Sequence, residues 1–196
     1  MFVRPLTAVA GATALLLASC DAVDLPVEQT VDGPTFEYTL PAGETDLRYE
    51  LTRTAPVTDV AAQLRVAGID NFVLDEVNVA SVAVELAYPT PAGSDGAAPL
   101  YLGDVAELAL AVSDATAPAV RIAAFSGTSE AGVTAADLTV AGDVDLLSYL
   151  DAEELVGTAA ITLAEPLTLA APVTVKLTAR YTVKARVTGG DGGAAE

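Results

Sequence analysis

Residues 172–188 read PVTVKLTARYTVKARVT, and this stretch decides the fold. From Val173 to Val187 every odd position is apolar, while every even position carries Thr, Lys or Arg. Only an extended strand places alternate side chains on opposite faces, so this period of two predicts a strand that is buried on one side. Val and Thr suit such a surface, because branched side chains pack well on a pleated sheet. The stretch therefore predicts a long half-buried strand that holds a sheet against a second layer.

The start of the chain has a different character. Met1 to Arg4 carries one positive charge, and the apolar run Pro5 to Leu17 is too short to span a bilayer as a helix. Such a run is typical of a signal peptide. It leads into Leu17-Ala18-Ser19-Cys20, which resembles the lipobox of bacterial lipoproteins. The resemblance implies that Cys20 receives a diacylglyceryl group, that residues 1–19 are removed and that the new amino terminus is acylated.

An ordinary signal peptide with an incidental thiol is the alternative to a lipobox. Cys20 is the only cysteine in the chain, so no disulfide can form within it and packing alone must hold the domain together.

The lipobox resemblance implies a cell-envelope protein that is anchored to the membrane by its acyl chains. The outer membrane is favoured over the inner one, although Asp21 resembles the inner-membrane retention signal of enteric lipoproteins.

Net charge excludes one class of partner. Without residues 1–19 the chain has 8 basic and 27 acidic residues, because Arg4 is the only charged residue removed, and its net charge is −19. Such a chain repels nucleic acid, so no nucleic-acid partner is expected. Dispersed acids with only two lysines resemble the surface of proteins from high-salt organisms. An acidic envelope protein without salt adaptation is the alternative.

The remaining residues divide into a tether, one domain and a tail. Residues 20–34 lack a sustained period and predict a flexible lipidated tether, residues 35–188 a single β-sandwich-like domain, and residues 189–196 a disordered tail. Within the domain, alternating segments predict a hairpin from residues 35–40 and 47–52. Helical spacing predicts a helix over residues 57–67, with Pro56 in its first turn and Gly68 just past its end.

A reversal of the alternation divides the next predicted strand, residues 71–88. The apolar parity changes in its middle, which predicts a β-bulge at Ala80-Ser81. A loop follows at residues 89–99, and then strands at residues 105–112, 120–124 and 138–140. Residues 143–155 are predicted as a second helix, and residues 156–169 as a strand that forms a long hairpin with residues 172–188, with Pro166 at an edge or bulge.

These elements predict a mainly β fold. We expect an antiparallel β-sandwich or flattened barrel of about seven to nine strands, with one or two short helices closing its ends. The order of elements over residues 50–187 also loosely resembles uncharacterised β-sandwich lipoproteins of the bacterial envelope. That resemblance rests on layout and implies no activity.

The side chains that usually carry out catalysis are scarce. The chain has no histidine, and its one cysteine is the predicted lipidation site, so histidine-based nucleophilic sites and the usual zinc sites are absent. A carboxylate pair suited to glycoside hydrolysis lacks an aromatic platform, because the chain has no Trp. Two oxygen-rich segments, residues 94–96 and 143–145, lack the spacing of a calcium loop. We therefore expect no enzyme activity, no cofactor and no metal.

The polar face of the last strand offers one candidate binding surface. It carries Lys176, Arg180, Lys184 and Arg186, half of the eight cations counted above. One interpretation is a stripe that docks an acidic protein partner or an anionic glycan of the envelope. The other is a structural role, in which the cations pair with acids on neighbouring strands and protect a long sheet edge.

Two functions follow as hypotheses. The first is a non-enzymatic, lipid-anchored structural or interaction module of the envelope, with an unspecified oligomeric state. The alternative is a carrier or binding protein that holds an apolar ligand between its sheets, because many interior positions are small Ala and Val.

Overall fold

The computed structural model describes residues 24–88, 100–126, 132–142 and 144–188. The predicted signal peptide, Cys20, the loop at residues 89–99 and the tail from residue 189 lie outside the described residues.

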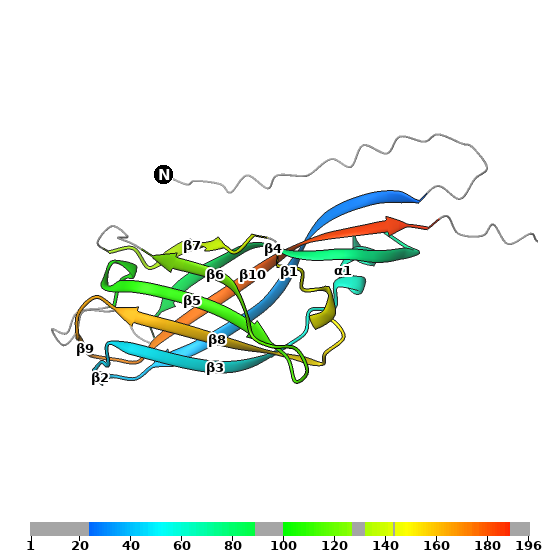
Figure 1. Ribbon diagram of the computed structural model, residues 1–196. Coiled ribbons are helices and arrows are strands. Elements are labelled where there is room, and N and C mark those ends of the chain that lie inside the picture. The colour runs from blue at the N-terminus through cyan, green and yellow to red at the C-terminus, as the bar shows by residue number, and fades with distance from the viewer. Residues whose placement is uncertain (1–23, 89–99, 127–131, 143, 189–196) are drawn as a thin grey trace, which may run out of the picture.

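Strands dominate the described residues (Figure 1). The elements in chain order are β1 (Leu25–Leu40), β2 (Gly43–Glu44), β3 (Arg48–Pro56), α1 (Val60–Val66), β4 (Phe72–Ala87), η1 (Leu102–Asp104), β5 (Val105–Ser113), β6 (Val120–Ser126), β7 (Ala135–Val140), η2 (Leu147–Tyr149), β8 (Glu154–Leu163), β9 (Thr168–Leu169) and β10 (Val173–Val187). Eight strands form one antiparallel sheet in the order β1-β10-β4-β7-β6-β5-β8-β3, while β2 and β9 pair with each other.

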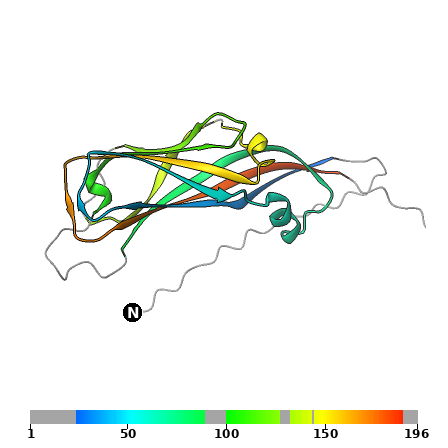
Figure 2. The same cartoon turned by 90° about the horizontal axis from the view of Figure 1, so that it is seen from below.

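The large sheet curls into two layers, which Figure 2 shows edge-on. β1, β10 and β4 form one layer, and β6, β5, β8 and β3 form the other. β7 joins them on one side because it pairs with both β4 and β6, and β1 lies against β3 on the other side. The curled sheet confirms the predicted mainly β class, a sandwich or flattened barrel with one short α-helix.

The predicted last strand is confirmed as β10. Its inward side chains from Val173 to Ala185 are all buried, with at most 2% of their surface exposed. β10 is not an edge strand, because it lies between β1 and β4. The part of the structural interpretation that gave it an edge to protect is therefore wrong.

Both predicted hairpins are wrong. β1 pairs with β10 and β3 with β8, so the chain between β1 and β3 crosses from one layer to the other instead of reversing within one. The segment from β8 to β10, which contains Pro166, makes the same kind of crossing. Thr45 and Leu167 tie the two crossings together, because each backbone N–H donates to an oxygen of the other residue at 2.8–2.9 Å. The hairpin prediction assumes that strands consecutive in the chain pair with each other, and these two crossings place them in different layers instead.

The tether prediction is wrong from Leu25 onward. Residues 25–34 form the first half of β1 and pair with the second half of β10, from Leu25 opposite Val187 to Asp32 opposite Arg180. Gly33 and Pro34 interrupt the register as a bulge instead of ending the strand. A Cβ at Gly33 would lie 3.1 Å from the Tyr181 ring, so glycine permits this close approach.

The predicted bulge in the long strand is confirmed. In β4, Ser81 pairs with Arg180 and Val79 pairs with Tyr181, which leaves Ala80 as the extra residue. A second extra residue, Asp75, was not predicted. Each bulge shifts the alternation by one position and keeps the apolar side chains on the inner face.

One predicted helix is confirmed in shortened form. α1 begins after Asp59, whose carboxylate accepts a hydrogen bond from the Ala62 N–H at 2.8 Å, and Gly68 follows its end with φ of +83°. Pro56 instead ends β3. No helix among the described residues is long and apolar enough to cross a bilayer.

The second predicted helix is wrong. Between residues 144 and 153 the 3-10 turn η2 is the only helical element, and β8 begins at Glu154. Asp145 explains part of this outcome, because its Oδ1 accepts hydrogen bonds from the N–H groups of Val77 and Leu147. These bonds tie the segment to the open edge of β4 and compete with a regular helix.

Large side chains fill the space between the layers. Phe36 and Tyr38 of β1 are each 1% exposed, and Tyr181 of β10 is fully buried. Phe36 reaches across to Gly157 of β8, where an added Cβ would lie 2.5 Å from the ring. The missing side chain of Gly157 therefore makes the hollow that receives the ring.

Candidate interaction surface

The four cations of the predicted stripe lie together on the outer face of β10. Their positions alternate with the buried residues of the strand, and their side chains point away from the core. The strands on both sides contribute acids to the same face, because β1 and β4 flank β10 along its length. We define this outer face of β1, β10 and β4 as the charged face.

Three of the cations form ion pairs with these acids. Lys184 Nζ donates to Glu76 Oε2 of β4 at 2.6 Å, and Arg180 Nε lies 3.5 Å from Asp32 Oδ1 of β1. Arg186 donates through Nε to both carboxylate oxygens of Asp75 at 2.9 Å.

Arg186 also holds a second acid. Its Nη2 lies 2.8 Å from Asp75 Oδ1, and its Nη1 lies 3.8 Å from Asp24 Oδ2, just before β1. The guanidinium group thus links the acids of the two strands that flank β10. Planar guanidinium suits this task, because it presents several donors in a fixed fork.

Lys176 sits in register between two further acids. Glu37 of β1 is its partner on one side, and Glu85 of β4 is its partner on the other. The cross-strand pairing that the sequence offered as a structural role is therefore confirmed by direct ion pairs for Arg180, Lys184 and Arg186. For Lys176 the structure shows only the two acids opposite it in register.

The balance of charge on the charged face is negative. Four cations face seven carboxylates, which gives a local net charge of −3; the carboxylates are those of Asp24, Glu28, Asp32, Glu37, Asp75, Glu76 and Glu85. Glu28 belongs to this set because it is the β1 partner of Lys184. The face as a whole therefore attracts cations more than anions.

The ion pairs shift the pKa values of their members. The hydrogen bond from Lys184 holds the pKa of Glu76 below its usual value, and the bond to Glu76 raises the pKa of Lys184. Asp75 likewise raises the pKa of Arg186. These side chains are open to solvent, so the pairs favour one register and orientation more than they add stability.

Two acids outside the charged face, Asp114 and Asp145, have structural partners. Asp114 lines an open cleft of about 570 Å³ with Asp151, Glu153 and Glu154. Hydrogen bonds from the backbone of Ala117 and Thr116 lower the pKa of Asp114, so this carboxylate stabilises its own turn. Of the candidate calcium segments, Asp145 is engaged as described above, and residues 94–96 and Asp143 lie outside the described residues. The described part of the chain holds no cluster of three potential metal ligands.

Three tyrosines have raised pKa values because they are buried. Burial raises the pKa of Tyr88 to about 12, and its hydroxyl donates to the Leu100 carbonyl. Burial also raises the pKa values of Tyr38 and Tyr181, whose hydroxyls have no hydrogen-bond partner among the described residues. Tyr38 and Tyr181 lie in different rungs of the β1-β10 ladder, opposite Val175 and Val31, so they do not form one polar site.

Sequence reasoning missed the acids that complete the charged face. A signal was present, because Glu28, Asp32 and Glu37 repeat at nearly the spacing of Lys184, Arg180 and Lys176 in the opposite direction. That complementarity predicts antiparallel pairing once residues 25–34 are recognised as a strand.

Comparison with known proteins adds no relationship. No family model matches this chain, and no curated protein matches it. The class defined by the fold is thus an antiparallel β protein with a curled eight-stranded sheet and a charged outer face.

Proposed function

We propose that this protein is a lipid-anchored module of the cell envelope that acts by contact with a partner and not by catalysis. The anchor follows from the lipobox resemblance at Leu17 to Cys20. The domain presents a broad, regular sheet face to its surroundings, and such a face suits protein contact.

One observation carries the contact function. The described ionisable groups with shifted pKa values have roles in the fold: Tyr38 and Tyr181 lie in the core and Tyr88 packs against it, Asp114 closes a turn, and Glu76, Lys184 and Arg186 join neighbouring strands. Catalytic acids and bases often have shifted pKa values and lie in a cleft beside the substrate. The shifts in this domain have structural causes instead.

The packing of the core favours this function over a carrier. A carrier needs a continuous apolar cavity of several hundred Å³ between its layers. Here Phe36 of one layer occupies the hollow at Gly157 of the other, so the layers are in direct contact at this point.

The charge of the face indicates the kind of partner. With a local net charge of −3, the charged face complements a basic protein surface better than the acidic partner or anionic glycan considered from the sequence. The partner would lie over the outer face of the sheet and not along the edges of β1 and β4, so side chains and not strand addition would provide the contact.

Expression of the full chain in a bacterium that processes lipoproteins tests the anchor. We expect the purified protein to begin at Cys20, to carry diacylglyceryl and acyl groups by mass spectrometry, and to sediment with membranes. The Cys20→Ser variant is the matched control and should carry no acyl group. An unmodified Cys20 in the wild-type chain would contradict the proposal.

Two further measurements test the contact function. A photo-crosslinking residue in place of Thr182, on the charged face, should give a discrete adduct in whole cells, while the same residue at Leu47, away from this face, should not. Native mass spectrometry should give the mass of the acylated chain alone. An additional bound lipid would favour the carrier.

A further inference from the structure

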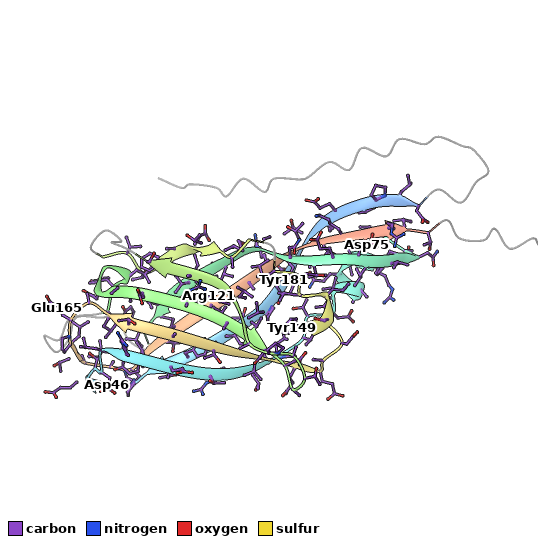
Figure 3. The ribbon with its side chains drawn as sticks, in the orientation of Figure 1. Asp46, Asp75, Arg121, Tyr149, Glu165 and Tyr181 are labelled. Carbon is purple, nitrogen blue, oxygen red and sulfur yellow. The ribbon has the colours of Figure 1, made fainter. Side chains whose placement is uncertain are left out.

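The three longest strands extend past the rest of the sheet at one end. β7 pairs with β4 only at residues 82–85, so the preceding half of β4 continues with β10 and β1 as a three-stranded ribbon. We call this ribbon the projecting end; it comprises residues 25–31, 72–79 and 181–187 (Figure 1). Figure 3 places Asp75 on it, while Asp46 and Glu165 lie at the opposite end of the molecule.

Aliphatic side chains are exposed at the projecting end. Leu25 and Val73 lie in its last two rungs and are 55% and 48% exposed. They point to opposite faces of the ribbon, because Leu25 shares a rung with Phe72, the neighbour of Val73. Val66 of the adjacent helix α1 is 90% exposed. These are three of the four large apolar side chains most exposed in the described part of the chain, and Leu47 is the fourth.

The chain that precedes the sheet enters at this same end. Asp24 is the first described residue, and Cys20 precedes it by four residues. Four extended residues span at most about 14 Å. An acyl group on Cys20 would therefore hold the projecting end close to the lipid surface, because the flexible tether expected over residues 20–34 is replaced by strand β1 from Leu25 onward.

Charge near the last rungs is partly neutralised. Arg186 holds the carboxylates of Asp75 and Asp24. Asp75 lies two residues after Val73 in the chain, and Asp24 directly precedes Leu25. A paired carboxylate approaches a zwitterionic lipid surface more readily than an isolated one, because part of its charge is already compensated.

We propose that the projecting end rests on the membrane, with Leu25 and Val73 entering the lipid interface and the sheet standing away from it. This inference rests on the proposed anchor at Cys20 and adds an orientation to it. Exposed aliphatic side chains on both faces of a narrow ribbon suit insertion end-on, and the short connection keeps them in reach. The charged face then stands roughly perpendicular to the membrane plane, where a partner beside the protein can reach it.

Site-specific fluorescence on the full, lipidated chain tests this orientation. Acylation blocks Cys20, so Val73→Cys supplies a single thiol for an environment-sensitive nitrobenzoxadiazole label. Leu47→Cys is the matched control, because Leu47 is 47% exposed and directly follows Asp46, which Figure 3 shows at the opposite end of the molecule. Each labelled protein is inserted into phosphatidylcholine vesicles with or without a lipid that carries a nitroxide near its headgroup.

We expect the nitroxide lipid to reduce emission from position 73 by about half or more and to leave position 47 nearly unchanged. Aqueous iodide should quench in the opposite order. Equal quenching at both positions, with Cys20 shown by mass spectrometry to be acylated, overturns the orientation and leaves the anchor standing. An unmodified Cys20 overturns the anchor and the orientation together.

Discussion

Substitution of Gly157 by alanine tests whether the two layers are locked together at Phe36. An ideal Cβ at this position would lie 2.5, 2.6 and 2.8 Å from three atoms of the Phe36 ring. Carbon atoms in contact normally lie about 3.5–4.0 Å apart, so the ring would have to move by about 1 Å. Phe36 is 1% exposed and stacks on Tyr38 with ring centroids 6.5 Å apart, which limits that movement.

Two opposing effects determine how much Gly157→Ala lowers the free energy of unfolding. Overpacking of a tight core costs about 1–3 kcal/mol. Loss of backbone freedom in the unfolded chain returns about 0.4–1 kcal/mol for any Gly→Ala change. We therefore expect Gly157→Ala to lower the free energy of unfolding by about 1–2 kcal/mol. Gly142→Ala should be neutral or slightly stabilising, because nothing lies within 4 Å of its Cβ position and its φ is not positive.

Equilibrium urea unfolding of the chain from residue 20 with Cys20→Ser, followed by circular dichroism, measures the difference. A second variant, Phe36→Leu, provides a double-mutant cycle with Gly157→Ala, since the smaller side chain makes room for the new methyl group. We expect the double variant to be less destabilised than the sum of the single changes by about 0.5 kcal/mol or more. Equal stability of the two alanine variants, or strict additivity in the cycle, would refute the reasoning.

Three other predictions concern burial, an edge and salt. Tyr181→Phe should raise the free energy of unfolding by about 1 kcal/mol, because it removes a buried hydroxyl that has no partner among the described residues. Burial raises the pKa of Tyr181 above its ordinary value of 10.0. Above pH 10 Tyr181 therefore ionises in the unfolded chain and not in the folded one, and the wild type should lose stability. A pH series of urea melts should show a smaller loss in the Tyr181→Phe variant. Gln63→Ala should cost about 1 kcal/mol in urea melts, because the Gln63 amide bonds both the N–H and the C=O of Asp32 on the outer edge of β1, whereas Gln29→Ala should have little effect. The melting temperature should rise from low to molar NaCl by calorimetry, because salt screens repulsion in a chain whose net charge is −19 without residues 1–19. A flat or falling profile would argue against salt adaptation.

The local sequence pattern predicted individual strands and helices better than it predicted which strands pair in the sheet. The period of two identified β10, and the change of parity located the bulge at Ala80, because both depend only on which side chains face the core. The glycine after α1 marked its end for an equally local reason. These predictions needed no information about distant residues.

Prediction of which strands pair in the sheet requires information about distant residues, which a local sequence pattern does not contain. The segments that contain Thr45 and Leu167 look like simple turns, yet they carry the chain between layers because they bond to each other across more than a hundred residues. The lack of a sustained period over residues 20–34, which contain Gly33 and Pro34, predicts a tether, whereas residues 25–34 pair with β10 and its register accommodates Gly33 and Pro34 as a bulge. The second predicted helix failed similarly, since Asp145 finds its partner in β4.

The cations of the charged face could be predicted from the sequence, but its acids could not. The cations of β10 share a face because of their spacing alone, which the structure confirms. Their acids lie on β1 and β4 and became recognisable only with the strand order, so the sign of the net charge could not be predicted. The docking role itself stays a prediction.

The pairing of the first long strand with the last one sets a condition on biogenesis. Leu25 lies opposite Val187, so the inner face of β1 stays uncovered until nearly the entire chain has been synthesised and translocated. Closing so large a loop is slow, and an unpaired strand of this length invites aggregation in the meantime. We therefore expect the nascent protein to depend on a holding chaperone, and a chain truncated before β10 to be degraded.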